Sequence, residues 1–135
     1  MTQEEKQLLL TDLCARLPYK VKVEAVPYAD PQILCSIDPI RKEFRLDFGE
    51  YKNIFATNWV GEEYSVVKPY LRPMSSMTEG EENELTSIAV LGGYNSSVFN
   101  SFVVVDWLNA HHFDYRGLID KGLALEASEG MYKTK

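Results

Sequence analysis

The sequence predicts one α+β domain with an N-terminal helix, a small antiparallel sheet and short C-terminal helices. Three observations lead to this fold class. Apolar residues recur at helical spacing near the N-terminus, an alternating pattern dominates residues 19–67, and capped apolar segments return after residue 78. The 135 residues suit a single domain over 1–135, because a chain of this length buries enough surface for one core.

The first helix is predicted from its start and stop signals. Thr2 and Glu5 match a capping box, in which each side chain satisfies a free backbone N–H of the other residue. Pro18 ends the helix because proline cannot continue the backbone hydrogen bonds. Apolar residues at helical spacing lie between these signals: Leu9, Leu10, Leu13, Cys14 and Leu17.

The sheet is predicted from short segments with a period of two, each with one buried face. The inward residues expected from this alternation are Val21, Val23, Ala25, Ile33, Cys35, Ile37, Phe44, Leu46 and Phe48. Further strands are expected over Ile54–Trp59 and Glu62–Val67, and Asp-Pro and Gly turns separate the segments. Four or five such strands form an antiparallel meander, which could curl into an SH3-like half-barrel.

Residues 68–77 are predicted to form an extended strap that leaves the sheet, because Pro69 and Pro73 restrict the backbone. The next part, 78–126, is predicted to run helix, strand, helix. Thr78 and Glu81 repeat the capping box, and the glycines at 92–93 close that helix. A strand is expected over Ser97–Val105 because Val and Phe favour strands.

Two short helices are predicted after this strand. Asp106 would cap one over Trp107–His112, and Asp114 would cap another over Tyr115–Lys121 that ends at Gly122. The polar tail 127–135 is expected to fray.

Composition and charge exclude several function classes. The chain has 14 basic and 20 acidic residues, so its net charge of −6 repels phosphate backbones and anionic lipid surfaces. We therefore expect neither direct nucleic-acid binding nor a membrane partner. The acidic N-terminus does not resemble a secretory signal, which predicts a cytoplasmic protein. Cys14 and Cys35 are expected to be reduced thiols in the core.

The candidate interaction surface lies near the C-terminus and contains residue types that are common at binding hot spots or in structural packing: Trp107, His111, His112, Asp114, Tyr115 and Arg116. The two histidines are adjacent, so their side chains should diverge rather than share a metal ion. One is expected to pack beside Trp107, and the other to be solvated. No cofactor or nucleotide motif is present, and we expect no cofactor.

Two blocks of the sequence resemble small proteins of gut anaerobic bacteria and their phages or prophages. They are KPYLRPMSSMTE, residues 68–79, and DWLNAHHFDYRGLI, residues 106–119. No activity is assigned to that set, so the resemblance implies a context and no catalytic residues. Small phage-carried proteins commonly bind other proteins.

Three functional hypotheses follow. The leading one is a non-enzymatic interaction or accessory protein that binds another protein, because the chain carries no catalytic signature. The second is a metal-binding or hydrolytic enzyme that uses His111, His112 and Asp114. The third is an acidic decoy, in which the carboxylates of 79–84 mimic phosphates and inhibit a nucleic-acid enzyme.

Overall fold

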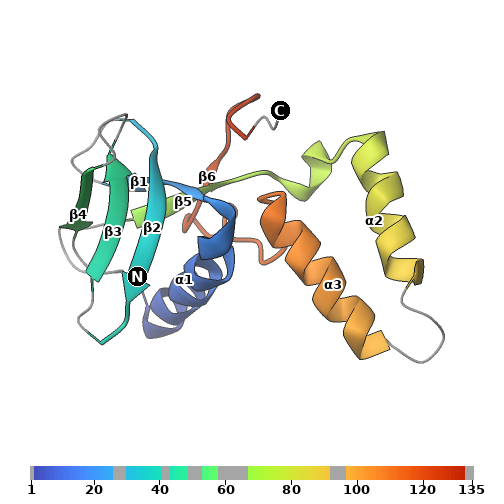
Figure 1. The fold of residues 1–135 in the computed structure, drawn as a ribbon, viewed down its shortest axis with the longest axis horizontal. Helices are drawn as coiled ribbons and strands as arrows, with labels where there is room; N and C mark the ends of the chain where they lie inside the picture. The colour runs from blue at the N-terminus through green and yellow to red at the C-terminus, as the bar shows by residue number, and fades with distance from the viewer. Residues whose placement is uncertain are drawn as a thin grey trace.

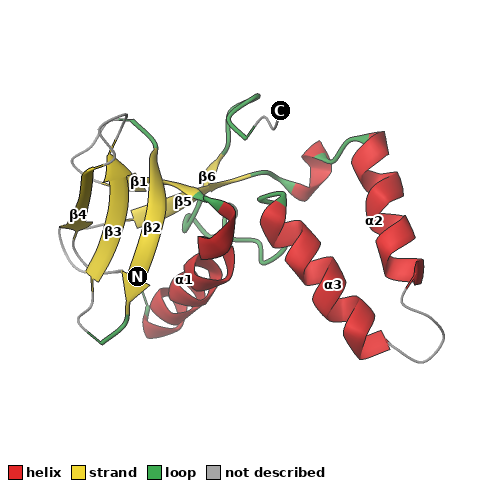
Figure 2. Ribbon diagram, in the orientation of Figure 1, coloured by secondary structure: helices red, strands yellow, loops and turns green. Residues whose placement is uncertain are grey.

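The computed structural model describes residues 2–25, 30–40, 43–48, 53–57, 67–91 and 97–132. A six-stranded sheet and the first helix form one part of the molecule, and a pair of helices extends from it (Figures 1 and 2). Buried side chains form two groups, a larger one in the sheet and first helix and a smaller one at the base of the helical pair. The α+β fold class predicted from the sequence is confirmed.

The first helix, α1, spans Gln3–Arg16 and begins at the predicted capping box. Glu5 N–H donates to Thr2 Oγ1 at 3.0 Å, and Thr2 N–H donates to Glu5 Oε1 at 2.8 Å. Leu9 and Leu13 are buried in the group of residues that the helix shares with the sheet. A single turn of 3₁₀ helix, η1 (Leu17–Tyr19), follows and contains Pro18. The N-terminal helix is therefore where the sequence predicts it.

The sheet has the strand order β4-β3-β2-β1-β5-β6. Its neighbours are antiparallel except for β5 and β6, which are parallel. The strands are β1 (Lys22–Ala25), β2 (Gln32–Asp38), β3 (Glu43–Phe48), β4 (Asn53–Thr57), β5 (Val67–Leu71) and β6 (Leu125–Glu126). The described strands pair as an open sheet, and closure into a half-barrel stays a prediction.

The predicted strap over 68–77 is wrong in its first part, because Val67–Leu71 is strand β5. It pairs with β1, with Val23 opposite Pro69. Proline is tolerated at such a position because β6 pairs with β5 only at Tyr70 and Leu71, so Pro69 has a strand partner on one side among the described residues. The predicted strand over Glu62–Val67 lies outside the described residues except for Val67.

A bulge changes the buried face of β2. Its pairing with β3 shifts register between Leu34 and Ser36. Leu34 is buried, Cys35 is exposed, and Ile37 packs against the core on the other side of the bulge. The prediction that Ile33 and Cys35 both face inward is therefore wrong, because one extra residue reverses the alternation. Val21, Val23, Phe44 and Leu46 are buried as predicted.

The cysteines differ from the prediction in their placement. Cys14 and Cys35 are free, as expected, but both are exposed rather than in the core. Cys14 lies on the outer side of α1, and the β2 bulge accounts for Cys35.

Two helices follow the sheet and pack against each other, α2 (Glu79–Leu91) and α3 (Ser97–Ala110). We call them the hairpin, and Figure 1 shows it extending away from the sheet. The capping box of α2 forms as predicted, with Glu81 N–H donating to Thr78 Oγ1 at 3.1 Å. A turn of 3₁₀ helix, η3 (Met74–Ser76), precedes it. Residues 92–93, predicted to close α2, lie outside the described residues.

The predicted strand over Ser97–Val105 is wrong, because these residues form most of α3. The preference of Val for strands is weak and yields to packing, and here Val104 contacts the buried group around Trp107. The predicted short helix over Trp107–His112 is helical through Ala110, but its start and its end are wrong. α3 continues through Asp106 and ends at Ala110, so Asp106 lies within a helix instead of capping one.

The segment after α3 forms turns instead of the predicted helix over Tyr115–Lys121. Gly117 and Gly122 adopt positive φ angles of 74° and 75°, and the first of these interrupts any helix. The tail also differs from its prediction. Residues 128–131 form a turn, and Tyr132 binds the sheet through its hydroxyl group.

Candidate interaction surface

Trp107 is buried at the base of the hairpin. Its ring stacks on His111 with 3.9 Å between centroids, and lies 5.8 Å from the ring of Phe113. Its Nε1–H donates to Glu84 Oε1 at 2.7 Å. Leu85, on α2, packs against the same group. Trp107 therefore joins α3 to α2 and presents little surface to a partner.

The two histidines diverge, as the sequence predicts for adjacent residues. His111 Nδ1 lies 2.9 Å from the carbonyl oxygen of Trp107, and its Nε2 lies 3.7 Å from Glu84 Oε1. His112 has a positive φ of 65° and stacks on Tyr132 with 3.7 Å between ring centroids. Only 8% of His112 is exposed, so the expectation that the second histidine is solvated is wrong.

Burial sets the protonation state of His112. Desolvation of the charged ring is the main cause that lowers its pKa from 6.5 to about 4, and the neighbouring Arg16, His111 and Arg72 contribute to the same shift. Its Nδ1 is buried and has no hydrogen-bond partner among the described residues. His112 is therefore neutral at pH 7 and serves as a packing residue under the C-terminal turn.

Asp114 uses both carboxylate oxygens to hold the turns that follow it. Leu118 N–H donates to Oδ1 at 2.8 Å, and Ile119 N–H donates to Oδ2 at 2.9 Å. Asp114 therefore caps turns instead of the predicted helix. The part of the chain that the structure describes contains no cluster of three or more possible metal ligands.

Tyr115 and Arg116 contact the rest of the fold. Tyr115 O–H donates to Asn109 Oδ1 at 2.9 Å, and the guanidinium of Arg116 lies 4.9 Å from the Tyr115 ring centroid. Arg116 Nη1–H donates to Asp12 Oδ1 at 2.8 Å. The candidate residues from Trp107 to Arg116 are thus brought together, but mainly as packing and hydrogen-bonding groups.

A buried ion pair in α1, missing from the sequence interpretation, anchors this region. Asp12 and Arg16 have fully buried side chains and bond at 2.8 Å. Arg16 Nη2–H also donates to the carbonyl oxygen of Phe113 at 2.7 Å. The i,i+4 spacing of Asp12 and Arg16 within a predicted helix is the signal that could have found the pair.

Arg72 forms a second anchor between the sheet and the hairpin. Its guanidinium binds Glu81 in a bidentate ion pair at 2.7 and 2.8 Å, and it lies 4.1 Å from the Phe113 ring centroid. The hydrogen bonds from Arg72 lower the pKa of Glu81 to about 2. Two of the four carboxylates of 79–84 thus have partners inside the molecule, Glu81 with Arg72 and Glu84 with Trp107. The other two are Glu79 and Glu82. Among the contacts of the described residues, only these two are available to act as an acidic decoy.

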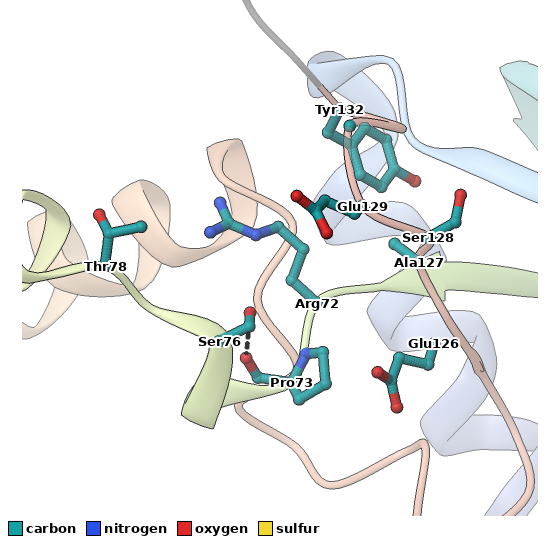
Figure 3. A pocket seen from close by; sticks show the side chains of 10 residues that line it. Arg72, Pro73, Ser76, Thr78, Glu126, Ala127, Ser128, Glu129 and Tyr132 are labelled. Carbon is teal, nitrogen blue, oxygen red and sulfur yellow. Dashed lines mark hydrogen bonds between the residues drawn. The ribbon is translucent and has the colours of Figure 1, made fainter.

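A pocket of about 630 Å³ lies between residues 72–78 and the C-terminal turn (Figure 3). Arg72 contributes its cationic group, which Glu81 already pairs, and Glu126 and Glu129 contribute exposed carboxylates. Ser76 Oγ donates to Pro73 O at 2.7 Å on the same wall. The pocket therefore offers mainly hydroxyl and carboxylate oxygens, without a nucleophile paired to a base among its lining residues.

The hairpin carries a different kind of surface away from its base. We define the distal face as Phe102 with its neighbours Val103 and Val105 on α3, since Leu85, Ile88 and Val104 pack against the buried group around Trp107. None of these side chains is fully buried, and Phe102 is 66% exposed. Val103, Val104 and Val105 are all partly exposed. Sequence reasoning missed this face because Ser97–Val105 was predicted to be a strand instead of part of a helix.

Comparison of the chain with models of protein families, with curated proteins and with solved structures finds no match. Among the described residues, no helix is both long and apolar enough to span a membrane.

Proposed function

We propose that this chain is a non-enzymatic protein-interaction or accessory protein that binds its partner through the distal face. The observation that carries the proposal is the exposure of apolar side chains on α3. Phe102 is two-thirds exposed, and Val103 and Val105 are partly exposed. Exposed apolar surface of this kind commonly marks a contact site.

The energetics of short helices support this assignment. α2 has 13 residues and α3 has 14, lengths at which an isolated helix is only marginally stable in water. Such helices depend on burial of an apolar face. α3 does not separate its polar and apolar residues onto opposite sides, and Phe102 lies largely exposed on it. A bound partner supplies burial for this side chain.

The burial of the other candidate residues also favours the distal face as the contact site. Trp107, His112 and Asp114 are buried and bonded within the fold, so they offer a partner little contact area. The resemblance to small proteins of gut anaerobes and their phages supports a binding role, since such proteins commonly act on other proteins.

Affinity capture from the producing cells tests the proposal. Phe102→Glu places a charge in the distal face, and Ile40→Glu makes the same change at a turn residue that is 93% exposed and lies outside the hairpin. We expect Phe102→Glu to lose the captured partner at least about tenfold and Ile40→Glu to retain it. Equal capture by the two variants would contradict the proposal.

A further inference from the structure

The pocket between residues 72–78 and the C-terminal turn has the size of a small-molecule site. Its volume of about 630 Å³ lies within the range of roughly 300–1,000 Å³ that such sites occupy. Hydrogen bonds to the sheet hold the wall formed by the end of the chain. Ala127 N–H donates to Leu71 O at 2.8 Å, and Tyr132 O–H donates to Tyr70 O at 2.7 Å. This wall is therefore in place before a ligand arrives, which lowers the cost of binding.

Two carboxylates give the pocket its charge. Arg72 is the one cation among the lining residues, and Glu81 neutralises it in a bidentate ion pair at 2.7 and 2.8 Å. Glu126 and Glu129 have exposed side chains with no hydrogen-bond or ion-pair partner among the described residues. Both extend from the end of the chain toward the side of residues 72–78 (Figure 3). The pocket thus carries two uncompensated negative charges in a protein of net charge −6, which favours a cationic ligand.

The hydrogen-bonding groups of the pocket are mainly acceptors. Ser76 O–H donates to Pro73 O at 2.7 Å, so the Ser76 oxygen is left to accept from a ligand. Thr78 Oγ1 already exchanges hydrogen bonds with Glu81. Ionised carboxylates only accept. A ligand that satisfies these groups brings N–H donors together with positive charge, and charge-assisted hydrogen bonds of this kind are the stronger class.

The volume of the pocket favours an organic cation over a metal ion. A bound metal ion draws its oxygen ligands to about 2.5 Å or less and would leave most of the 630 Å³ unfilled. We propose that the pocket binds an organic cation with ammonium or guanidinium groups, which Glu126 and Glu129 bind. A free polyamine and a basic side chain of another protein share this chemistry. The inference goes beyond the proposed function, because the pocket and the distal face have no residue in common.

Calorimetric titration of the purified full chain with spermidine tests the proposal. Because both carboxylates are exposed, we expect a Kd of about 0.1–1 mM that rises with salt concentration. The double variant Glu126→Gln, Glu129→Gln should bind at least about tenfold more weakly. Its circular dichroism and thermal unfolding should match those of wild type, since neither side chain has a partner among the described residues.

A matched double variant separates the pocket from the overall charge of the protein. Glu4→Gln, Asp120→Asn removes the same number of exposed carboxylates outside the pocket and should bind like wild type. A loss of binding in this control as large as that in the pocket variant overturns the proposal. Wild-type affinity in the pocket variant overturns it as well.

A second probe distinguishes the two sources of the cation. An acetylated and amidated peptide with one lysine and one arginine carries the basic groups of a protein without free chain ends. Tighter binding of spermidine assigns the pocket to a free polyamine, and tighter binding of the peptide assigns it to a basic side chain of another protein. A wild-type chain that binds neither probe overturns the proposal.

Nuclear magnetic resonance locates the bound cation. On saturation with the tighter probe, the backbone amide signals of residues 72–78 and 126–132 should shift, and those of β3 should stay in place. Shifts centred on another part of the chain, such as the acidic start of α2, would contradict binding in this pocket.

Discussion

Arg16 in α1 donates a hydrogen bond from Nη2 to the carbonyl oxygen of Phe113, 97 positions later in the chain, at 2.7 Å. The same guanidinium binds Asp12 at 2.8 Å, and both side chains are fully buried. This contact joins the first helix to the turn after α3. It fixes the base of the hairpin against the body of the fold.

Arg16→Met should lower the free energy of unfolding by about 3 kcal/mol, since removing one member of a buried pair leaves the other charge and the Phe113 carbonyl with fewer partners. Arg116→Met is the matched control, because Arg116 binds the same carboxylate but has a side chain that is 23% exposed. Its cost should be about 1 kcal/mol or less. Urea denaturation measures both values. An Arg116→Met cost equal to or larger than that of Arg16→Met contradicts the anchoring role.

Tyr132→Phe should release the C-terminal turn from the sheet. The hydroxyl group donates to Tyr70 O at 2.7 Å and accepts from Lys22 N–H at 2.8 Å, and the substitution leaves the Tyr70 and Lys22 groups without it. We expect a loss of about 1–3 kcal/mol in the free energy of unfolding and faster proteolysis of the last residues. The ring of phenylalanine retains the stack on His112. Unchanged stability and unchanged proteolysis would show that the hydroxyl bonds contribute nothing.

Stability should fall as the pH decreases from about 6.5 to about 4, because His112 stays neutral in the folded protein and is protonated in the unfolded chain. The unfolded state binds more protons over this window, so the free energy of unfolding rises with pH by at most about 1.4 kcal/mol per unit from this residue. Glu81, with a folded pKa of about 2, adds its effect below about pH 4.5.

Comparison of wild type with His112→Asn isolates the histidine contribution between pH 4.5 and 6.5. Asparagine tolerates the positive φ of 65° at this position and does not titrate. Urea denaturation should show a smaller slope against pH for the variant. The same slope in both proteins would place the pH dependence on other groups.

Local chemistry made parts of this fold predictable from the sequence. The capping boxes at Thr2 and Thr78 depend on side chains three residues apart, and both helices begin where they indicate. The alternation over Val21–Ala25 and in β3 likewise places Val21, Val23 and Phe44 in the core.

Features that depend on distant contacts were not predictable. The β2 bulge reverses the buried face at Cys35 because of its pairing with β3. The Val residues of α3 were predicted to form a strand. The preference of valine for strands carries no information about packing on α2. The sequence could not show that Arg116 pairs with Asp12 or that His112 stacks on Tyr132, because these partners lie far away along the chain.

Hydrogen exchange of the full chain, measured with its captured partner bound, tests most directly whether the distal face is covered. Peptides from residues 97–106 should exchange more slowly in wild type than in Phe102→Glu, and β3 peptides should exchange alike in both. Equal exchange across 97–106 in the two proteins would contradict the claim that this face is a contact surface.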